Sequence, residues 1–452
     1  MTQSIPRRQF IQGLAGALAA PMVVPSRVLG QDAPSNKLNM AMIGAGWFGF
    51  AMLDYFMNDS RVNMLAVCDV NKESAGYNSN SVKGREPARR KVNNFYGNQN
   101  CEVYEDFREL LARGDLDCVG IATPDQWHAI PTIEAAKAKI HVYCQKPLSL
   151  TVAEGRLMAN AVHENGIVFQ CGSQQRSGFR FRRACELVLN GRIGKLQKVF
   201  VNIPGGAPDL SGQAHRNEPE PIPEGFNYNF WLGQAPERPY IPARSHVNFR
   251  WFYDYSGGMI TDWGAHHIDI GQWGMGMEKS GPIAIRNASA TFATGVYNTP
   301  IHYAYDCIYE NGVVMNVSNT GSRGVEFHGE DGWIFVSRGG WNANPTSVLE
   351  EEIGAADIQL IDSNDHYRNF IDGIIDGKPT IAPIEDAHRT ATLCHLGNIA
   401  LQLGRDLKWD PQTETVYNDG TAQQMLSRKA REPWDSYLPP RDASIKSASF
   451  LK

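Results

Sequence analysis

The stretch Leu38–Asp69 decides the fold. It reads LNMAMIGAGWFG from residue 38 and, after about a helix's worth of residues, VNMLAVCD from residue 62. The first apolar run leads into Gly44, Gly46 and Gly49, the G-x-G-x-x-G spacing of a strand–turn–helix unit that binds a dinucleotide. The second apolar run ends in Asp69. Strand, glycines, helix, strand and acid in this order predict a dinucleotide-binding half with a parallel sheet.

Each glycine of the turn has a separate physical role. Gly44 permits the tight turn, Gly46 lets the backbone approach a pyrophosphate, and Gly49 lets the helix pack close to its strand. Trp47 and Phe48 open the following helix, where unpaired backbone N–H groups attract an anion. We therefore expect these residues to contact the cofactor. The alternative is a glycine turn of the same fold that binds nothing.

Asp69 follows the second strand at the position where an acid accepts hydrogen bonds from an adenosine ribose diol. The same negative charge would repel a 2′-phosphate. The sequence therefore predicts NAD as the cofactor in preference to NADP.

Composition narrows the class of protein. The chain has 452 residues, of which 42% are hydrophobic and 20% are charged, as in globular proteins of two ordinary domains. The net charge of −5 argues against nucleic acid or an anionic membrane as a partner. The eight cysteines show no C-x-x-C and no metal-ligand spacing, so we expect small core side chains, no disulfide framework and no metal site.

The first thirty residues have the pattern of an export signal. Arg7 and Arg8 precede an apolar, small-residue run over 13–24, followed by Pro25 and a small-residue stretch that ends near Gly30. This resembles a twin-arginine signal peptide, and the run is too short and too rich in Gly and Ala for a good membrane span. We expect residues 1–30 to direct the folded protein to the periplasm and 31–37 to be a linker. A disordered cytoplasmic tail is the alternative.

Two domains follow the linker. Residues 38–172 alternate strand and helix, with a long charged insertion over 71–91, and this predicts a doubly wound, Rossmann-type parallel sheet that binds ligands at the carboxyl ends of its strands. Residues 173–452 form the second domain. Its expected parts are a strand at 196–203, a long Gly-, Pro- and aromatic-rich segment at 204–255, a helix at 257–273, four or five antiparallel strands over 284–336, helices at 366–375 and 384–403, and an irregular polar tail.

Lys146 lies at a strand end where a nicotinamide ring is expected. It can hydrogen-bond both the reacting hydroxyl and the cofactor amide, although a loop lysine on the surface would show the same pattern. Gln145 precedes it in the motif QKP. An earlier strand ends in Thr123-Pro124 and is followed by His128. We expect Thr123, Pro124, His128, Gln145 and Lys146 to contact the cofactor.

Asp262 and His266 are four residues apart in the predicted helix 257–273 and therefore share one face. His266 can take a hydroxyl proton as hydride leaves, and Asp262 can orient it and stabilise the imidazolium. A helix cap or a core histidine is the structural alternative. His267 points about a quarter-turn away and is more ordinarily structural, but we include it among the candidate substrate contacts.

The segment 204–255 supplies the remaining candidate substrate contacts. It carries Arg244, His246, Arg250 and Trp251 among many aromatic residues. Long loops in compact proteins are commonly functional, and this mixture suits a polyol. It equally suits a loop held in place by its own packing, and both interpretations stay open.

Together these motifs resemble the Gfo/Idh/MocA oxidoreductase family. The resemblance runs from about residue 38 to 434 and includes the glycine fingerprint, Thr123-Pro124-Asp125 with His128, Lys146-Pro147, the D-x-G-x-H of 262–266, the WLG of 231–233 and the late stretch 382–398. It is similar above all to an exported bacterial subgroup.

This family resemblance implies a Rossmann domain followed by an α/β domain with a mostly antiparallel open sheet. It also implies catalytic roles for Lys146, Asp262 and His266, sugar or polyol substrates, and homodimers or homotetramers. One position departs from the family pattern, because Gln145 stands where Glu is usual. We expect the lost charge to make Lys146 easier to deprotonate.

The leading functional hypothesis is an oxidoreductase that moves hydride between a ring carbon of a sugar, polyol or glycoside and tightly bound NAD. Outside the cytoplasm, reduced cofactor cannot readily exchange, so it would have to be returned to its starting state in place. The alternative is glycoside cleavage or epimerisation through a transient keto-sugar. A non-catalytic sugar-binding protein is a third possibility, against which the set Lys146, Asp262 and His266 argues.

Overall fold

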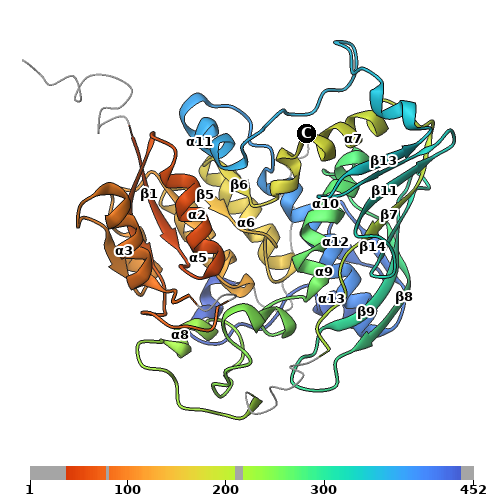
Figure 1. Cartoon of the computed structure of the whole chain (residues 1–452). Helices are drawn as coiled ribbons and strands as arrows, with labels where there is room; N and C mark the ends of the chain where they lie inside the picture. Colours follow the sequence, from red (N-terminus) through yellow and green to blue (C-terminus); the bar gives the residue numbers. More distant parts are fainter. Residues whose placement is uncertain (1–36, 78–80, 209–216, 439–452) are drawn as a thin grey trace, which may run out of the picture.

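A computed structural model describes residues 37–77, 81–208 and 217–438. The expected export signal over 1–30 and most of the expected linker lie outside these ranges. Two sheets form the framework, a parallel one in the N-terminal half and a larger, mostly antiparallel one in the C-terminal half (Figure 1). The predicted α/β fold class is confirmed.

The N-terminal sheet has six parallel strands in the order β3-β2-β1-β4-β5-β6. They are β1 (Leu38–Ile43), β2 (Val62–Cys68), β3 (Glu102–Tyr104), β4 (Cys118–Ile121), β5 (His141–Cys144) and β6 (Phe169–Cys171). This is the doubly wound order in which the chain reverses direction between β1 and β4, so the carboxyl ends of these strands open a crevice for a ligand. Most strand residues are buried because helices cover both faces of the sheet.

The helices of this half follow the predicted alternation with one correction. They are α2 (Trp47–Met57), α3 (Arg85–Tyr96), α4 (Phe107–Leu111), α5 (Ala129–Lys137) and α6 (Val152–Asn165). Thr151 caps the start of α6, since its side chain accepts a hydrogen bond from the Glu154 N–H at 3.2 Å. The insertion over 71–91 was predicted without a helix, but its second half begins α3. The many charged residues of this helix left too few apolar side chains for a helical pattern to be recognised in the sequence.

The C-terminal sheet has nine strands in the order β13-β12-β11-β7-β10-β9-β8-β14-β15. The β7–β10 pair is parallel and all other pairs are antiparallel. The strands are β7 (Leu196–Asn202), β8 (Ala284–Phe292), β9 (Pro300–Ile308), β10 (Val314–Ser318), β11 (Gly324–Gly329), β12 (Trp333–Val336), β13 (Trp341–Asn344), β14 (Leu407–Asp410) and β15 (Thr415–Val416). The tail was predicted to be irregular, but β14 and β15 extend the sheet.

The helices of the C-terminal half are α7 (Phe179–Leu189), α8 (Tyr228–Leu232), α9 (Met259–Asp262), α10 (Gly264–Gly274), α11 (His366–Asp376), α12 (Ile384–Leu403) and α13 (Gly420–Gln424). The predicted single helix over 257–273 is divided at Trp263 into α9 and α10. Buried α12 packs against α6 on one side and against β8 and β9 on the other, which joins the two halves through a helical layer (Figure 1).

A fully buried arginine fixes the position of α10. Arg176, just after β6, donates to both carboxylate oxygens of Asp269 on α10 at 2.8 and 2.7 Å and to Asp386 on α12 at 2.8 Å. A buried charge is stable only when it is paired in this way. The cluster ties the end of the parallel sheet to the helix that carries His266.

Two further observations complete the fold. All eight cysteines of the chain fall within the described residues, where each is buried and unpaired. Within the same ranges, no helix has both the length and the apolar character needed to cross a membrane.

Candidate active site

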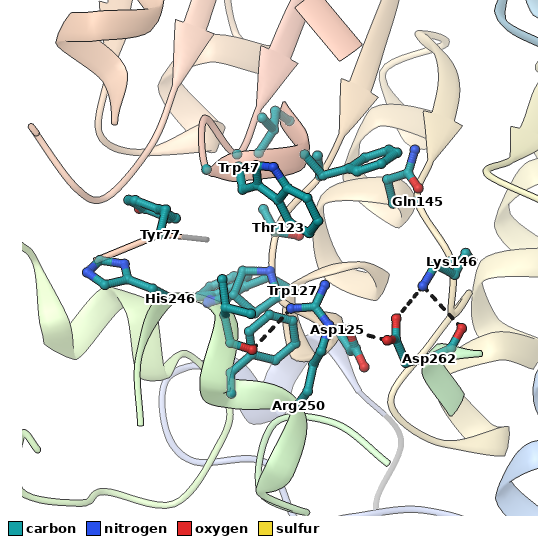
Figure 2. A pocket seen from close by; sticks show the side chains of 18 of the residues that line it. Trp47, Tyr77, Thr123, Asp125, Trp127, Gln145, Lys146, His246, Arg250 and Asp262 are labelled. Atoms are coloured by element: carbon teal, nitrogen blue, oxygen red, sulfur yellow. Dashed lines mark hydrogen bonds and ion pairs between the residues drawn. The ribbon is translucent and has the colours of Figure 1, made fainter. Parts of the chain in front are cut away.

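A cavity of about 1000 Å³ lies at the carboxyl ends of the parallel strands. The Rossmann half lines one wall, and residues within 174–181, 226–266 and 364–367, together with Arg338, line the rest. Figure 2 shows Tyr77 and His246 at one side of this cavity, Lys146 and Asp262 at the opposite side, and Asp125 and Arg250 between them.

The glycine turn has the geometry predicted for it. Gly44 has φ +93°, and a Cβ there would lie 2.6 Å from the backbone of Ala122. A Cβ on Gly49 would lie 2.1 Å from the Gly44 carbonyl oxygen. No side chain larger than hydrogen fits either place, so β1, β4 and α2 can approach only because these residues are glycine.

The start of α2 can receive an anion. Gly46 is its N-cap residue and supplies no side-chain cap, so the first backbone N–H groups of the helix stay available. Trp47 and Phe48, both expected at the cofactor, line the cavity at this point. The ring of Tyr77 lies 3.0 Å from where a Gly46 Cβ would be, so Gly46 also leaves room for that ring.

Asp69 lines the cavity at the end of β2. One carboxylate oxygen accepts from the Ala45 N–H at 2.6 Å and the other from the Asn71 N–H at 2.8 Å. Burial raises the pKa of Asp69, and these two donors oppose that shift. Each oxygen keeps a lone pair that can accept a ribose hydroxyl. The glycine turn, the uncapped helix start and Asp69 together fit a dinucleotide with an unphosphorylated ribose.

Thr123, Pro124 and Gln145 also line the cavity, whereas His128 does not. The two ring nitrogens of buried His128 face the carbonyl oxygens of Pro147 at 2.7 Å and Thr123 at 3.0 Å. Burial lowers the pKa of His128 to about 4. The structure therefore places His128 below the cavity floor, where it holds the two strand-end turns in register.

Lys146 and Asp262 meet across the domain boundary. The Lys146 ammonium donates to the Asp262 carboxylate and to the Asp262 carbonyl oxygen at 3.1 Å. Arg250 lies 3.6 Å from the second carboxylate oxygen. Burial acts to raise the pKa of Asp262, but Lys146 and Arg250 outweigh it and hold the pKa well below its usual range. One carboxylate therefore serves two cations (Figure 2).

Two expectations about these residues need revision. Asp262 was expected to orient His266, but within the described ranges no hydrogen bond joins their side chains, and Asp262 is paired with Lys146. The side chain of Gln145 does not face the Lys146 ammonium either, because it donates to the Met52 sulfur at 3.2 Å and accepts from Gln174 at 3.4 Å. The negative charge beside Lys146 comes from Asp262.

His266 is buried and lines the same cavity. Burial, followed by the charges of Lys146 and Arg338, lowers the pKa of His266 well below its usual value. Its Nδ1 has no hydrogen-bond partner among the described residues. A neutral imidazole with a free nitrogen beside a carboxylate can accept a proton from a substrate hydroxyl.

Asp125 adds a second acid–base group to the cavity. Its buried carboxyl accepts from the Ser256 hydroxyl at 2.6 Å. Burial raises the pKa of Asp125 to about 7, while Ser256 and Arg250 oppose the shift. A carboxyl that titrates near neutrality can donate as well as accept a proton. In the sequence, Asp125 stands out only as part of the Thr123-Pro124-Asp125 motif.

The five candidate substrate contacts separate into three groups. Arg250 and Trp251 line the cavity, and Arg250 lies beside Asp262. His246 also lines it, but its ring lies 4.2 Å from that of Tyr77 and its Nε2 lies 3.4 Å from Ser74 Oγ, at the cofactor end. Arg244 and His267 do not line it. His267 contacts the Asn202 carbonyl at 3.0 Å, and Arg244 binds the Pro239 carbonyl.

Most aromatic residues of the segment 204–255 pack against one another, and Phe226, Trp231 and Phe249 of this cluster also line the cavity. Phe226, Tyr228, Trp231, Tyr240, Phe249, Phe252 and Tyr255 belong to one buried cluster. The Trp231 carbonyl accepts from Gln126 at 3.1 Å and from the Trp127 indole at 2.9 Å, which fastens the segment to the Rossmann half. Both open interpretations hold in part, since packing pins the loop and a few of its residues reach the cavity.

Three cavity residues had no signal in the sequence. Tyr77 lies in the charged insertion, Gln175 follows β6, and Arg338 lies in the turn after β12. In the amide orientation that satisfies both neighbours, Gln175 accepts from Arg338 Nε at 3.0 Å and donates to the His266 carbonyl at 3.2 Å. Only the packing of the two domains brings these residues together.

Two protein-family models match this chain. One, described as the oxidoreductase family's NAD-binding Rossmann fold, covers 38–173, and the other, its C-terminal alpha/beta domain, covers 186–436. The chain belongs to the Gfo/Idh/MocA oxidoreductase family. Its cofactor is NAD, in agreement with the glycine turn and Asp69.

Curated relatives align with parts of this Gfo/Idh/MocA chain. An uncharacterized oxidoreductase, YrbE, of Bacillus subtilis is 27% identical over 58% of this chain and 64% of its own length. Glycosyl hydrolase family 109 protein 1 of Shewanella sp. MR-4 is 30% identical over 44% and 42%. Myo-inositol 2-dehydrogenase of Thermotoga maritima is 32% identical over 24% and 32%. The chain thus spans less than two thirds of the length of each of these relatives.

Solved structures share the Gfo/Idh/MocA fold over nearly their whole length. The WlbA dehydrogenase of Bordetella pertussis, in complex with NADH and UDP-GlcNAcA, has a TM-score of 0.58 at 16% identity, over 83% of this chain and 99% of its own. The aldose-aldose oxidoreductase of Caulobacter crescentus, complexed with glycerol, has a TM-score of 0.57 at 19% identity, over 82% and 99%. At these identities the likeness establishes the fold.

Proposed function

We propose that this protein oxidises or reduces a ring carbon of a sugar, polyol or glycoside with NAD that stays bound. The observation that carries this proposal is the cluster of Lys146, Asp262 and His266 in the same cavity as the glycine turn and Asp69. A hydroxyl-bearing carbon placed between them would meet a cofactor site on one side and proton-handling groups on the other.

Each residue of the cluster has a distinct role. Lys146 donates a hydrogen bond to the reacting oxygen, and Asp262 holds the ammonium in place through its charge-assisted contact. His266 takes the hydroxyl proton, and the nearby Asp262 carboxylate raises its affinity for that proton. Arg250 compensates Asp262 from the other side. NAD, when bound, supplies the hydride acceptor.

The names of the relatives support a carbohydrate substrate. One is an inositol dehydrogenase, and two structures of the same fold are a dehydrogenase with a nucleotide sugar and an aldose-aldose oxidoreductase. We extend this class, and no particular member of it, to the present chain.

We propose in addition that the chain is exported by the twin-arginine route and forms homodimers or homotetramers. Arg7, Arg8 and the apolar run over 13–24 support the first point, and the open nine-stranded sheet supports the second. Export would require the cofactor to be carried in the folded protein and regenerated in place. Fractionation of cells after Arg7→Lys/Arg8→Lys, and light scattering of the purified protein, test these two points.

Glycoside cleavage or epimerisation through a transient keto-sugar is the second candidate. Oxidation of a ring carbon acidifies the neighbouring C–H, so a base can remove that proton and the aglycone can leave with a proton from an acid. Asp125, a buried carboxyl whose pKa is about 7 in the same cavity, favours this chemistry because it supplies a group beyond His266 and Lys146. A relative named as a glycosyl hydrolase is consistent with it.

The deciding experiment is near-ultraviolet absorbance of the purified protein with no NAD added, before and after a panel of sugars and glycosides, with product analysis in the same tubes. A lasting rise in reduced-nicotinamide absorbance supports the dehydrogenase. A released aglycone or epimer without a lasting rise supports the second candidate. Absence of nicotinamide from the denatured supernatant, with none taken up, refutes bound NAD and both proposals.

A further inference from the structure

The substrate end of the cavity carries more positive charge than its carboxylates balance. Lys146, Arg250 and Arg338 line it together with His266. Lys146 and Arg250 share the carboxylate of Asp262, and Asp125, whose pKa is about 7, is the other acid close to them, so the three cations still exceed the negative charge. Arg338 forms no ion pair with Asp262, whose charge acts on it only at longer range.

Arg338 is held by a tryptophan. Its guanidinium carbon lies 4.5 Å from the ring centroid of Trp263, and that of Arg323 lies 4.7 Å from the same ring. Arg338 follows β12 and Arg323 precedes β11, so two turns at one end of the large sheet deliver both cations to one indole. Stacking on an aromatic face orients a guanidinium but leaves the N–H donors at its edge free.

Neither of these two guanidinium groups has an anionic partner within the described residues. The one polar contact of Arg338 is the Gln175 amide, which in turn touches the backbone of His266. Burial and the neighbouring charge of Arg323 lower the pKa of Arg338. Two like charges placed side by side cost free energy until an anion joins them.

This local excess is not a property of the whole chain. The protein has a formal net charge of −5, and the many other arginines near acids form ion pairs, such as Arg176 with Asp269 and Arg113 with Asp115. Arg338 borders the cavity without an ion-pair partner among the described residues, and the paired N–H donors of its guanidinium match a carboxylate or a sulfate.

We infer that the substrate is an anionic sugar, whose carboxylate or sulfate binds to Arg338 beside Trp263 while its ring lies against Lys146 and His266, and that the charge of Arg323 on the same indole strengthens this binding. This inference rests on the proposed function for the identity of the reacting group. It adds the substrate class and assigns Arg338 and Arg323 as the residues that select it. Arg338 borders the cavity, and Arg323, which does not line it, contacts the same indole.

Matched ligand pairs test the inference. The probes are methyl glycosides of glucuronate and galacturonate, the parent glucosides and galactosides, and the corresponding sugar 6-sulfates. Each is titrated by calorimetry into the exported protein with its bound cofactor, and reduced-nicotinamide absorbance is followed in parallel. The variants are Arg338→Gln and Arg323→Gln. The control is Arg286→Gln, an exposed arginine on β8 that removes the same charge from the same sheet without lining the cavity.

We expect at least one anionic sugar to bind about ten- to a hundred-fold more tightly than its neutral parent, the range of one or two charge-assisted hydrogen bonds. Arg338→Gln should remove most of this preference, Arg323→Gln part of it, and Arg286→Gln none. Preference for uronides identifies a carboxylate, and preference for 6-sulfates identifies a sulfate ester.

Equal affinity for charged and neutral partners throughout the panel would overturn the inference, as would a preference that survives Arg338→Gln. The two readouts separate this result from the fate of the proposed function. Absence of nicotinamide reduction and of any product, with charge preference intact in calorimetry, would refute the hydride chemistry and leave the anionic ligand. Hydride transfer to neutral sugars alone would do the reverse.

Discussion

The two ends of the cavity are built in different ways. The cofactor end depends on the backbone, because Gly44 and Gly49 let chain segments approach and Gly46 leaves helix N–H groups free. The substrate end depends on side-chain charge, gathered from β5, the long segment, α9 and the turn after β12. One end is therefore sensitive to the addition of atoms, and the other to the loss of charges.

The largest effect is expected from Lys146→Met, which keeps the length of the side chain and removes its charge. Turnover should fall by roughly 10²- to 10⁴-fold, the range of a positioned proton-transfer or hydrogen-bonding group, while bound NAD is retained. Single-turnover absorbance and nicotinamide content of the denatured protein measure the two quantities. Lys137→Met, which removes an exposed lysine of α5 paired with Glu134, is the control.

A different outcome for Lys146→Met would be informative. Loss of NAD together with turnover would mean that the charge of Lys146 belongs to the cofactor end, and the contrast between the two ends would fail. Normal turnover would leave Lys146 as a structural partner of Asp262.

The fold was predictable from sequence to the extent that its signals are local. β1 and β2 begin and end at the residues expected, because apolar runs bounded by glycines and an acid lie within a single stretch of chain. α3 was missed because its sequence, REPARRKVNNFY, shows few apolar residues and is held by packing against the sheet. β14 and β15 were missed because such short strands exist only through pairing, β14 with β8 and β15 with β14.

The residues of the candidate active site were likewise predictable only where their signal is local in the sequence. The glycines, Asp69, Lys146, Asp262 and His266 stand in motifs, so their presence in one cavity could be expected. The pairing of Asp262 with Lys146 could not, since 116 residues separate them and the helix breaks at Trp263. Arg338 had no motif at all. Residues whose role comes from domain packing are invisible to local patterns.

The second prediction tests the cofactor end by adding one carbon. Gly49→Ala would place a Cβ at 2.1 Å from the Gly44 carbonyl oxygen, both of them backbone-fixed. We expect a loss of about 3 kcal/mol in unfolding free energy and loss of bound NAD, because α2 must move from β1. Gly340→Ala, where a Cβ would meet nothing within 4 Å, is the control. Thermal unfolding with and without NAD measures both, and an unaltered transition would show that the turn can yield.

The third prediction concerns pH. The pKa of Asp125 in the folded protein, about 7, lies above the 3.8 of an exposed aspartate, so between these pH values the folded protein binds a proton that the unfolded chain has lost. Stability should therefore fall as pH rises from about 4 to 7, by about 4 kcal/mol at most. Asp125→Asn should remove this decline and be the more stable protein at pH 8.

Denaturant titrations across this pH range check the third prediction, with exposed Asp435→Asn as the control. Parallel curves for Asp125→Asn and the unaltered protein would contradict a buried carboxyl that titrates near neutrality. If the second candidate function holds, the same substitution should also abolish aglycone release while the first hydride transfer continues.

The fourth prediction changes the charge of the cofactor end without changing its shape. Asp69→Asn keeps one acceptor for the backbone donors at Ala45 and Asn71 but loses the negative charge. We expect NAD affinity to fall about tenfold, as for the loss of one charge-assisted hydrogen bond, and discrimination against NADP to weaken. Competitive reloading of the cofactor-free protein with the two nucleotides measures this. Unchanged discrimination would remove Asp69 from cofactor selection.

The smallest effect is expected at His246, which was predicted at the substrate end of the cavity and lies at the cofactor end. His246 was predicted to bind substrate, but its ring lies against Tyr77 and beside Ser74, on the loop that follows Asp69. His246→Ala should therefore speed NAD release by roughly two- to tenfold, the worth of one aromatic contact, and leave the KM for sugar unchanged. Dissociation of bound NAD into an excess of competitor measures the first quantity, with exposed His302→Ala on β9 as the control. A raised KM for sugar with unchanged NAD release would instead assign His246 to the substrate end.

The contact between Tyr77 and His246 would then belong to the sugar site. In that case the cavity could no longer be divided into one end built by the backbone and another built by charged side chains.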